Sequence, residues 1–157
     1  MVMRALPNRK SYVKHLKQLK AEPVVENGST GWIVPGIHDF EHYRLPVLVE
    51  PPWSKGINDC SESYCHVAAL VGLDGKVYIG IARPNWMDGY SRKLGLAIAA
   101  GRALENLIEI KADFQITGEL PVGIKLRDYC RGLALEYCKS NLIPLVNIME
   151  PELGYRD

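Results

Sequence analysis

Residues 66–82 read HVAALVGLDGKVYIGIA, and this stretch decides the fold. Two apolar runs, 66–72 and 76–82, flank the tripeptide Leu73-Asp74-Gly75. An Asp-Gly step between two apolar runs favours a tight turn, because glycine readily adopts the positive φ that such a turn requires. The sequence therefore predicts an antiparallel β-hairpin over 66–82.

Helical patterns follow the hairpin. Residues 91–110 begin with a serine that suits a helix N-cap, and a helix there would bury one stripe formed by Leu94, Ala97, Ile98, Gly101, Leu104 and Ile108. A second helix is expected at about 125–139, with Cys130 and Cys138 as small buried hydrophobic residues. The apolar run that follows Pro144 is typical of a last strand.

The N-terminal part of the chain has a weaker pattern. Residues 8–20 (NRKSYVKHLKQLK) predict an amphipathic helix with one basic face. Residues 21–64 are interrupted by glycine and proline and are expected to form an irregular insertion, with short strands at 31–34 and 45–50.

Length and composition bound the class of protein. The 157 residues, 47% hydrophobic and 24% charged, suit one ordinary globular domain and exclude collagen-like, disordered and disulfide-scaffold classes. There is no apolar run long enough for a membrane span and no secretory signal, so a cytoplasmic protein with no membrane partner is expected. Residues 8–20, 21–64, 65–110 and 111–157 would then build one α+β domain over residues 1–157.

Charge is distributed unevenly along the chain. Residues 1–20 hold six of the 19 lysines and arginines and no acid, which leaves 13 basic and 18 acidic residues, a net charge of −5, in the rest. Such an asymmetry favours a polyanionic partner, whereas a solvated helix face is the alternative. The basic residues of the first helix that would meet such a partner are Arg9, Lys10, Lys14 and Lys17.

The start of the 91–110 helix carries the strongest functional signal. If Ser91 is the N-cap, Arg92 and Lys93 stand where the helix dipole already disfavours positive charge. A bound anion would explain both bases, because unpaired amides and two cations would converge on one phosphate-sized group. Arg83 would contact the same anion from the preceding strand, and Arg102 a second phosphate. Trp86 and Tyr90 are candidates for stacking on a base. A solvated helix start without a ligand is the alternative.

Ser91-Arg92-Lys93, followed by Ala99-Ala100 and Ala103-Leu104, resembles the second helix of the double-stranded-RNA-binding domain. The early helix and the hairpin also fit the α-β-β-β-α order of that family. The resemblance implies that Arg92 and Lys93 contact duplex phosphates, while the first helix and the first hairpin loop touch minor grooves.

A second resemblance rests on a Gly-x-Ala step, an Asp, Ser91-Arg92-Lys93 and the Gly-Arg-Ala-Leu of 101–104. This pattern resembles small phage-encoded proteins, some of which sequester cyclic-nucleotide immune signals. It implies a small phosphorylated nucleotide as ligand.

A metal site is an alternative in the insertion. His38 and His42 have the spacing that places two imidazoles on one face of a helix, and Cys60 and Cys65 follow. Two nitrogens and two thiolates would suit a tetrahedral zinc, although this order of ligands is uncommon. A cysteine–histidine enzyme built on Cys60 or Cys65 with His42 or His66 is a related alternative.

The sequence thus favours a non-catalytic protein that binds phosphate anions, with a nucleic acid or a small phosphorylated nucleotide as ligand and no cofactor. There is no nucleophile motif, P-loop or dinucleotide fingerprint, so no catalytic residue is assigned. The many alanines and glycines of the 91–110 helix allow close packing, either in the core or in a homo-oligomer. A protein-interaction module is therefore a further alternative.

Overall fold

The structure, a computed structural model, describes residues 5–26, 28–49, 61–84, 92–108 and 115–146. Its elements in chain order are β1 (Leu6–Pro7), the 3-10 helix η1 (Lys10–Tyr12), α1 (Val13–Gln18), β2 (Glu22–Glu26), β3 (Ser29–Ile33), β4 (Ile37–Val49), β5 (Ser61–Gly72), β6 (Lys76–Ala82), α2 (Arg92–Ile108), β7 (Gln115–Glu119) and α3 (Leu126–Ser140). Helices together with antiparallel sheets confirm the α+β class. None of the described helices is long and apolar enough to cross a bilayer.

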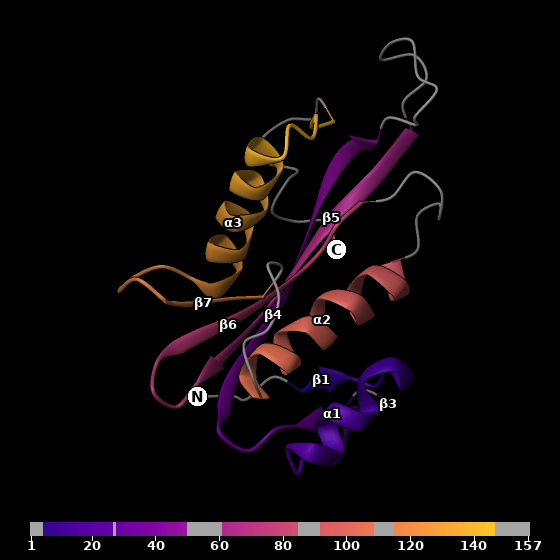
Figure 1. Cartoon of the computed structure of the whole chain (residues 1–157). Helices are drawn as coiled ribbons and strands as arrows, with labels where there is room; N and C mark the ends of the chain where they lie inside the picture. The colour runs from indigo at the N-terminus through magenta and orange to yellow at the C-terminus, as the bar shows by residue number, and fades with distance from the viewer. Residues whose placement is uncertain (1–4, 27, 50–60, 85–91, 109–114, 147–157) are drawn as a thin grey trace.

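A four-stranded antiparallel sheet in the order β4-β5-β6-β7 forms the middle layer. Figure 1 shows α3 along one face of this sheet and α2 on the other, with η1, α1 and the small sheet β1-β3-β2 beside α2. Side chains alternate between the faces of a strand, so β5 supplies both cores. Ala68 and Leu70 face α2, whereas Val67 and Ala69 face α3.

The predicted hairpin is confirmed. The amide of Gly75 donates to the Gly72 carbonyl at 3.0 Å, and Gly75 has a φ of +82°. The Asp74 carboxylate accepts a hydrogen bond from the Lys76 amide at 3.0 Å, which fixes the turn. The first strand is longer than expected, since β5 begins at Ser61.

The irregular insertion predicted over 21–64 is wrong for the part that the structure describes, although the short strands expected at 31–34 and 45–50 overlap β3 and β4. β2 and β3 pair with each other, and β4 pairs with β5 from Ile37 to Val49. Many residues at the start of β4 are polar, so the composition of this segment does not indicate a strand. The segment forms a strand because it pairs with β5. Pro46 is tolerated because β4 lies at the edge of its sheet.

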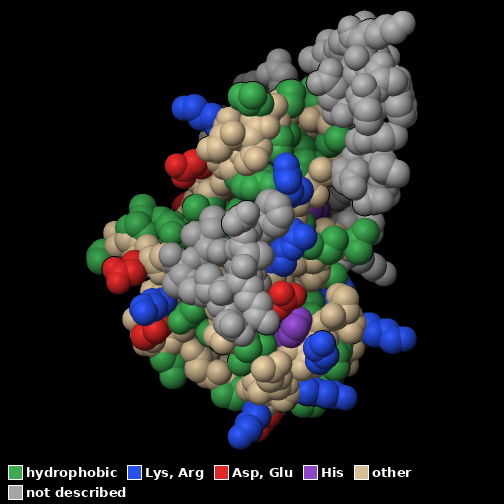
Figure 2. Space-filling model, viewed as in Figure 1, with side chains coloured by type: hydrophobic (Ala, Val, Ile, Leu, Met, Phe, Trp, Pro, Cys, Tyr) green, Lys and Arg blue, Asp and Glu red, His purple; other side chains and the backbone are tan. Residues whose placement is uncertain are grey.

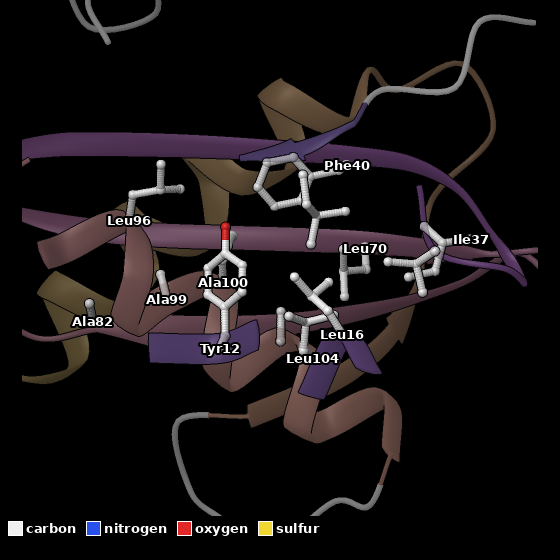
Figure 3. Packing of buried hydrophobic residues seen from close by; sticks show 14 residues of the cluster. Tyr12, Leu16, Ile37, Phe40, Leu70, Ala82, Leu96, Ala99, Ala100 and Leu104 are labelled. Carbon is white, nitrogen blue, oxygen red and sulfur yellow. The ribbon is translucent and has the colours of Figure 1, made fainter. Parts of the chain in front are cut away.

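Helix α2 has the expected position and buries part of the expected stripe, namely Ala97, Gly101 and Leu104. Leu94 and Ile98 are instead 48% and 37% exposed, and the inner face also includes Leu96, Ala99, Ala100 and Ala103. Figure 3 shows Ala99, Ala100 and Leu104 packed with Tyr12 and Leu16 of the N-terminal helices. The small residues face inward because α2 lies unusually close to the sheet. A Cβ on Gly80 would lie 2.1 Å from the Ala99 carbonyl oxygen.

The remaining predictions have mixed outcomes. α3 confirms the second predicted helix, and Cys130 and Cys138 are both buried. η1 and α1 occupy most of the predicted first helix. Strand β7 was not predicted. Beyond Pro144, Leu145 forms an isolated bridge with Val47, and the residues from 147 onward lie outside the described part of the chain.

Candidate functional site

The start of α2 lies over the end of the central sheet where β6 finishes. His66 of β5 is paired with Ala82 of β6, and its ring packs directly against Gly95 in the first turns of α2. A Cβ at Gly95 would lie 2.2 Å from His66 Nε2. The glycine therefore allows the helix to rest on the imidazole.

Several of the predicted anion-binding residues fall outside this description. Ser91, Trp86 and Tyr90 lie outside the described residues. Arg92 and Lys93 form the first turn of α2, and their side chains also lie outside what the structure describes. No acidic residue stands in that first turn, so the helix dipole meets no negative side chain of its own there.

Arg102 reaches from α2 to the end of β6. Gly80 leaves room for Arg102 to pass the strand, and the Arg102 guanidinium donates a short hydrogen bond to the Ile81 carbonyl. Arg83 follows Ile81 by two residues. Burial raises the pKa of Tyr137 on α3, and the charges of both arginines act against that rise.

A hydrogen bond with Cys138 and burial raise the pKa of buried Cys65, and the charge of Arg83 acts against that rise. The sequence suggested that Arg102 meets a second phosphate higher on the helix. In the structure the Arg102 guanidinium lies on the Ile81 carbonyl at the end of β6, and the second phosphate remains a prediction.

A pocket of about 230 Å³ opens between β6 and α3. Its walls are mostly apolar with a polar margin, and they are formed by Ile81, Leu133, Glu136, Tyr137, Ser140 and Asn141. Sequence reasoning did not single out Tyr137. The sequence pattern predicts that Tyr137 lies on a helix, but it does not indicate that Tyr137 lies near the end of β6.

A second polar cluster lies beneath the start of α2. His42 Nε2 and His66 Nδ1 are 2.8 Å apart, so one ring donates a hydrogen bond and the other accepts it. The Arg44 guanidinium lies 4.8 Å from the centre of the Tyr64 ring, a cation–π distance. His42, Arg44, Tyr64 and His66 share one face of β4 and β5. Arg44 and Tyr64 were missed because β4 was not predicted over this length.

The proposed zinc ligands do not converge. His38 and His42 lie on strand β4, so the argument from helical spacing is wrong for them. Cys65 belongs to the core under α3, whereas His42 faces α2, and the sheet separates them. Cys60 lies outside the described residues. Among those that are described, no three histidines, cysteines or acids gather as a metal site would require.

The basic side chains of the first helix are displayed on the surface. Lys10, Lys14 and Lys17 are exposed, while Arg9 is half-buried and donates to the Asn8 carbonyl at 2.9 Å. Tyr12 and Leu16 anchor the opposite side in the core. Figure 2 shows Lys and Arg side chains projecting from the end of the molecule where α1 lies.

Comparisons with protein-family models, with curated proteins and with solved structures give no match to this chain.

Proposed function

We propose that this protein is a non-catalytic binder of phosphate-containing ligands, either a nucleic acid or a phosphorylated nucleotide. The observation that carries the proposal is that Arg102 of α2 is held on the Ile81 carbonyl at the end of β6, two residues before Arg83 in the chain. Two guanidinium groups and a helix N-terminus are the donors that proteins use most often for phosphate.

The length of α2 supports the binding of an anion at its N-terminus. α2 runs for 17 residues, so its aligned peptide dipoles give the N-terminus a partial positive charge. Arg92 and Lys93 add two formal charges at that end. Each costs a few tenths of a kcal/mol in the absence of an anion, and a phosphate would reverse the sign of that contribution.

The fixed orientation of the Arg102 side chain supports its proposed role in binding a phosphate. Its bond to the Ile81 carbonyl holds the side chain across the edge of β6 before any ligand arrives. An oriented guanidinium loses less conformational entropy on binding than a mobile one, so such a residue adds more to affinity.

Exposed Lys10, Lys14 and Lys17 would add attraction that does not depend on sequence if the ligand is a polymer. The resemblance to the double-stranded-RNA-binding domain makes an RNA duplex the polymer to test. The order α1, β4, β5, β6, α2, with β2 and β3 inserted, fits that resemblance. The likeness to phage proteins makes a cyclic dinucleotide the small ligand to test.

The deciding experiment measures binding of a labelled RNA duplex and of a cyclic dinucleotide to the full chain. Replacement of Arg92 and Lys93 by glutamate is expected to weaken binding of the true ligand at least roughly tenfold. The matched control replaces Lys76 and Lys125, which are exposed and lie at the ends of β6 and α3 opposite to the pocket, with the same change of net charge.

The salt dependence then identifies the ligand class. Affinity for a polymer falls steeply with salt, whereas affinity for a small nucleotide changes much less. If wild-type protein binds neither probe, or if the R92E/K93E variant and the control bind equally well, the proposal is wrong and a protein-interaction module becomes the better hypothesis.

A further inference from the structure

Two buried cysteines from distant parts of the chain meet under α3. Cys65 lies on β5 and Cys138 in the last turn of α3, and both are at most 1% exposed. They belong to the same hydrophobic core, and their thiols share a hydrogen bond. Both are free thiols in this structure.

From this contact we infer that Cys65 and Cys138 form a redox-active pair, which peroxide converts into a disulfide that fastens α3 to the central sheet. The inference is independent of the phosphate-binding proposal. No part of that proposal uses either thiol.

The two thiols are suited to different roles. The hydrogen bond from Cys65 lowers the pKa of Cys138, although burial acts in the opposite direction. The same bond and burial raise the pKa of Cys65. Cys138 follows Tyr137 of the pocket wall, so the proposal assigns the first attack to Cys138 and the second to Cys65.

On this proposal a small oxidant would approach the two thiols from the pocket between β6 and α3, although neither cysteine lines it. Its walls include Tyr137, which adjoins Cys138 in sequence, and Ile81, which pairs with Val67 on the same sheet face as Cys65. Hydrogen peroxide is small enough for a pocket of about 230 Å³. Cys130 is also fully buried on α3, but burial raises its pKa and it faces Glu41 and Arg127 rather than a second thiol.

The chemistry balances with one peroxide. The Cys138 thiolate attacks a peroxide oxygen, the O–O bond breaks, and a sulfenic acid and hydroxide form. The Cys65 thiolate then attacks the Cys138 sulfur and expels the second hydroxide. Both hydroxides take up the protons that the two thiols released, so two thiols are oxidised by two electrons and one peroxide is reduced to two waters.

The test treats the folded full-length protein with hydrogen peroxide, quenches it with acid, alkylates it in denaturant and maps the peptides by mass. The expected product is a Cys65–Cys138 linked peptide that lacks two hydrogens, with Cys130 recovered as an alkylated thiol. Closing the long loop between the two residues should raise the melting temperature by roughly 10 °C, and a reductant should reverse this shift.

Cys138→Ala should abolish the link, and the matched control Cys130→Ala should retain it. If Cys138→Ala does not fold, the peptide map of the wild-type protein still decides. The inference is overturned if Cys138 proceeds to sulfinic acid while Cys65 stays a thiol, if Cys60 takes part in the main disulfide, or if the link forms only in unfolded protein.

Discussion

Replacement of Gly80 by alanine should destabilise this protein far more than one methyl group ordinarily does. Gly80 lies on β6 directly beneath α2. A Cβ at this position would be 2.1 Å from the Ala99 carbonyl oxygen and 2.4 Å from the Ala103 amide nitrogen. Ordinary contacts of a Cβ begin at about 3.4 Å, so the overlap exceeds 1 Å.

The overlap cannot be relieved by a change of rotamer. Both obstructing atoms belong to the backbone of α2 and are held by its hydrogen bonds, and alanine has no side-chain torsion that moves its Cβ. The helix must therefore retreat from the sheet, which opens gaps around fully buried Ala99, Ala100 and Ala103. Overpacking of this kind costs about 3 kcal/mol, at the upper end of the usual range. In a chain of this size that cost lowers the melting temperature by about 6–12 °C.

Thermal unfolding followed by circular dichroism measures this shift, and urea unfolding gives the free energy independently. The matched control is Gly132→Ala on α3, where an added Cβ meets nothing within 4 Å. That variant should gain up to about 1 kcal/mol, because alanine is the better helix former. If Gly80→Ala were as stable as the wild type, α2 would not lie this close to β6, and the account of the core given above would be wrong.

Two further predictions test the packing around α2. Gly95→Ala should cost about 2 kcal/mol because its Cβ would lie 2.2 Å from His66 Nε2, and His66→Ala should remove much of that cost in a double-mutant cycle. Equal costs in both backgrounds would show that the ring is not the obstacle. Tyr12→Phe removes the hydrogen bond that the buried Tyr12 hydroxyl donates to the Pro7 carbonyl, so urea unfolding should report a loss of about 1 kcal/mol. An unchanged urea midpoint would refute the role assigned to this bond.

The hairpin and the two long helices were predictable because their signals are local. Asp74-Gly75 has the turn chemistry that a hairpin requires, and α2 and α3 have apolar residues at helical spacing. What the pattern did not settle was which stripe of α2 faces inward. Leu94 and Ile98 are more hydrophobic than the alanines that are buried in their place. The inner stripe is determined by the close approach of α2 to Gly80. No local sequence pattern indicates that approach.

The first half of strand β4 escaped prediction for a different reason. Residues 38–44 of this strand, HDFEHYR, do not alternate regularly between polar and apolar side chains. The spacing of the two histidines is also that of residues on one face of a helix. The strand is ordered by its pairing with β5, a non-local interaction. For the same reason the sequence identified Arg102 as a cation of interest but could not place it at the end of β6. The contact of Arg102 with the Ile81 carbonyl depends on how α2 lies on the sheet.

The two close-packed glycines therefore connect the stability of the core with the geometry of the candidate site. Gly80 sets the distance of α2 from β6 and so allows Arg102 to reach the Ile81 carbonyl. Gly95 sets the start of the same helix on the His66 ring. A side chain at either position must displace the helix, and with it the cations that the proposed phosphate site requires. Binding and stability should consequently decline together in Gly80→Ala, whereas the charge variant at Arg92 and Lys93 should lose binding and keep its stability.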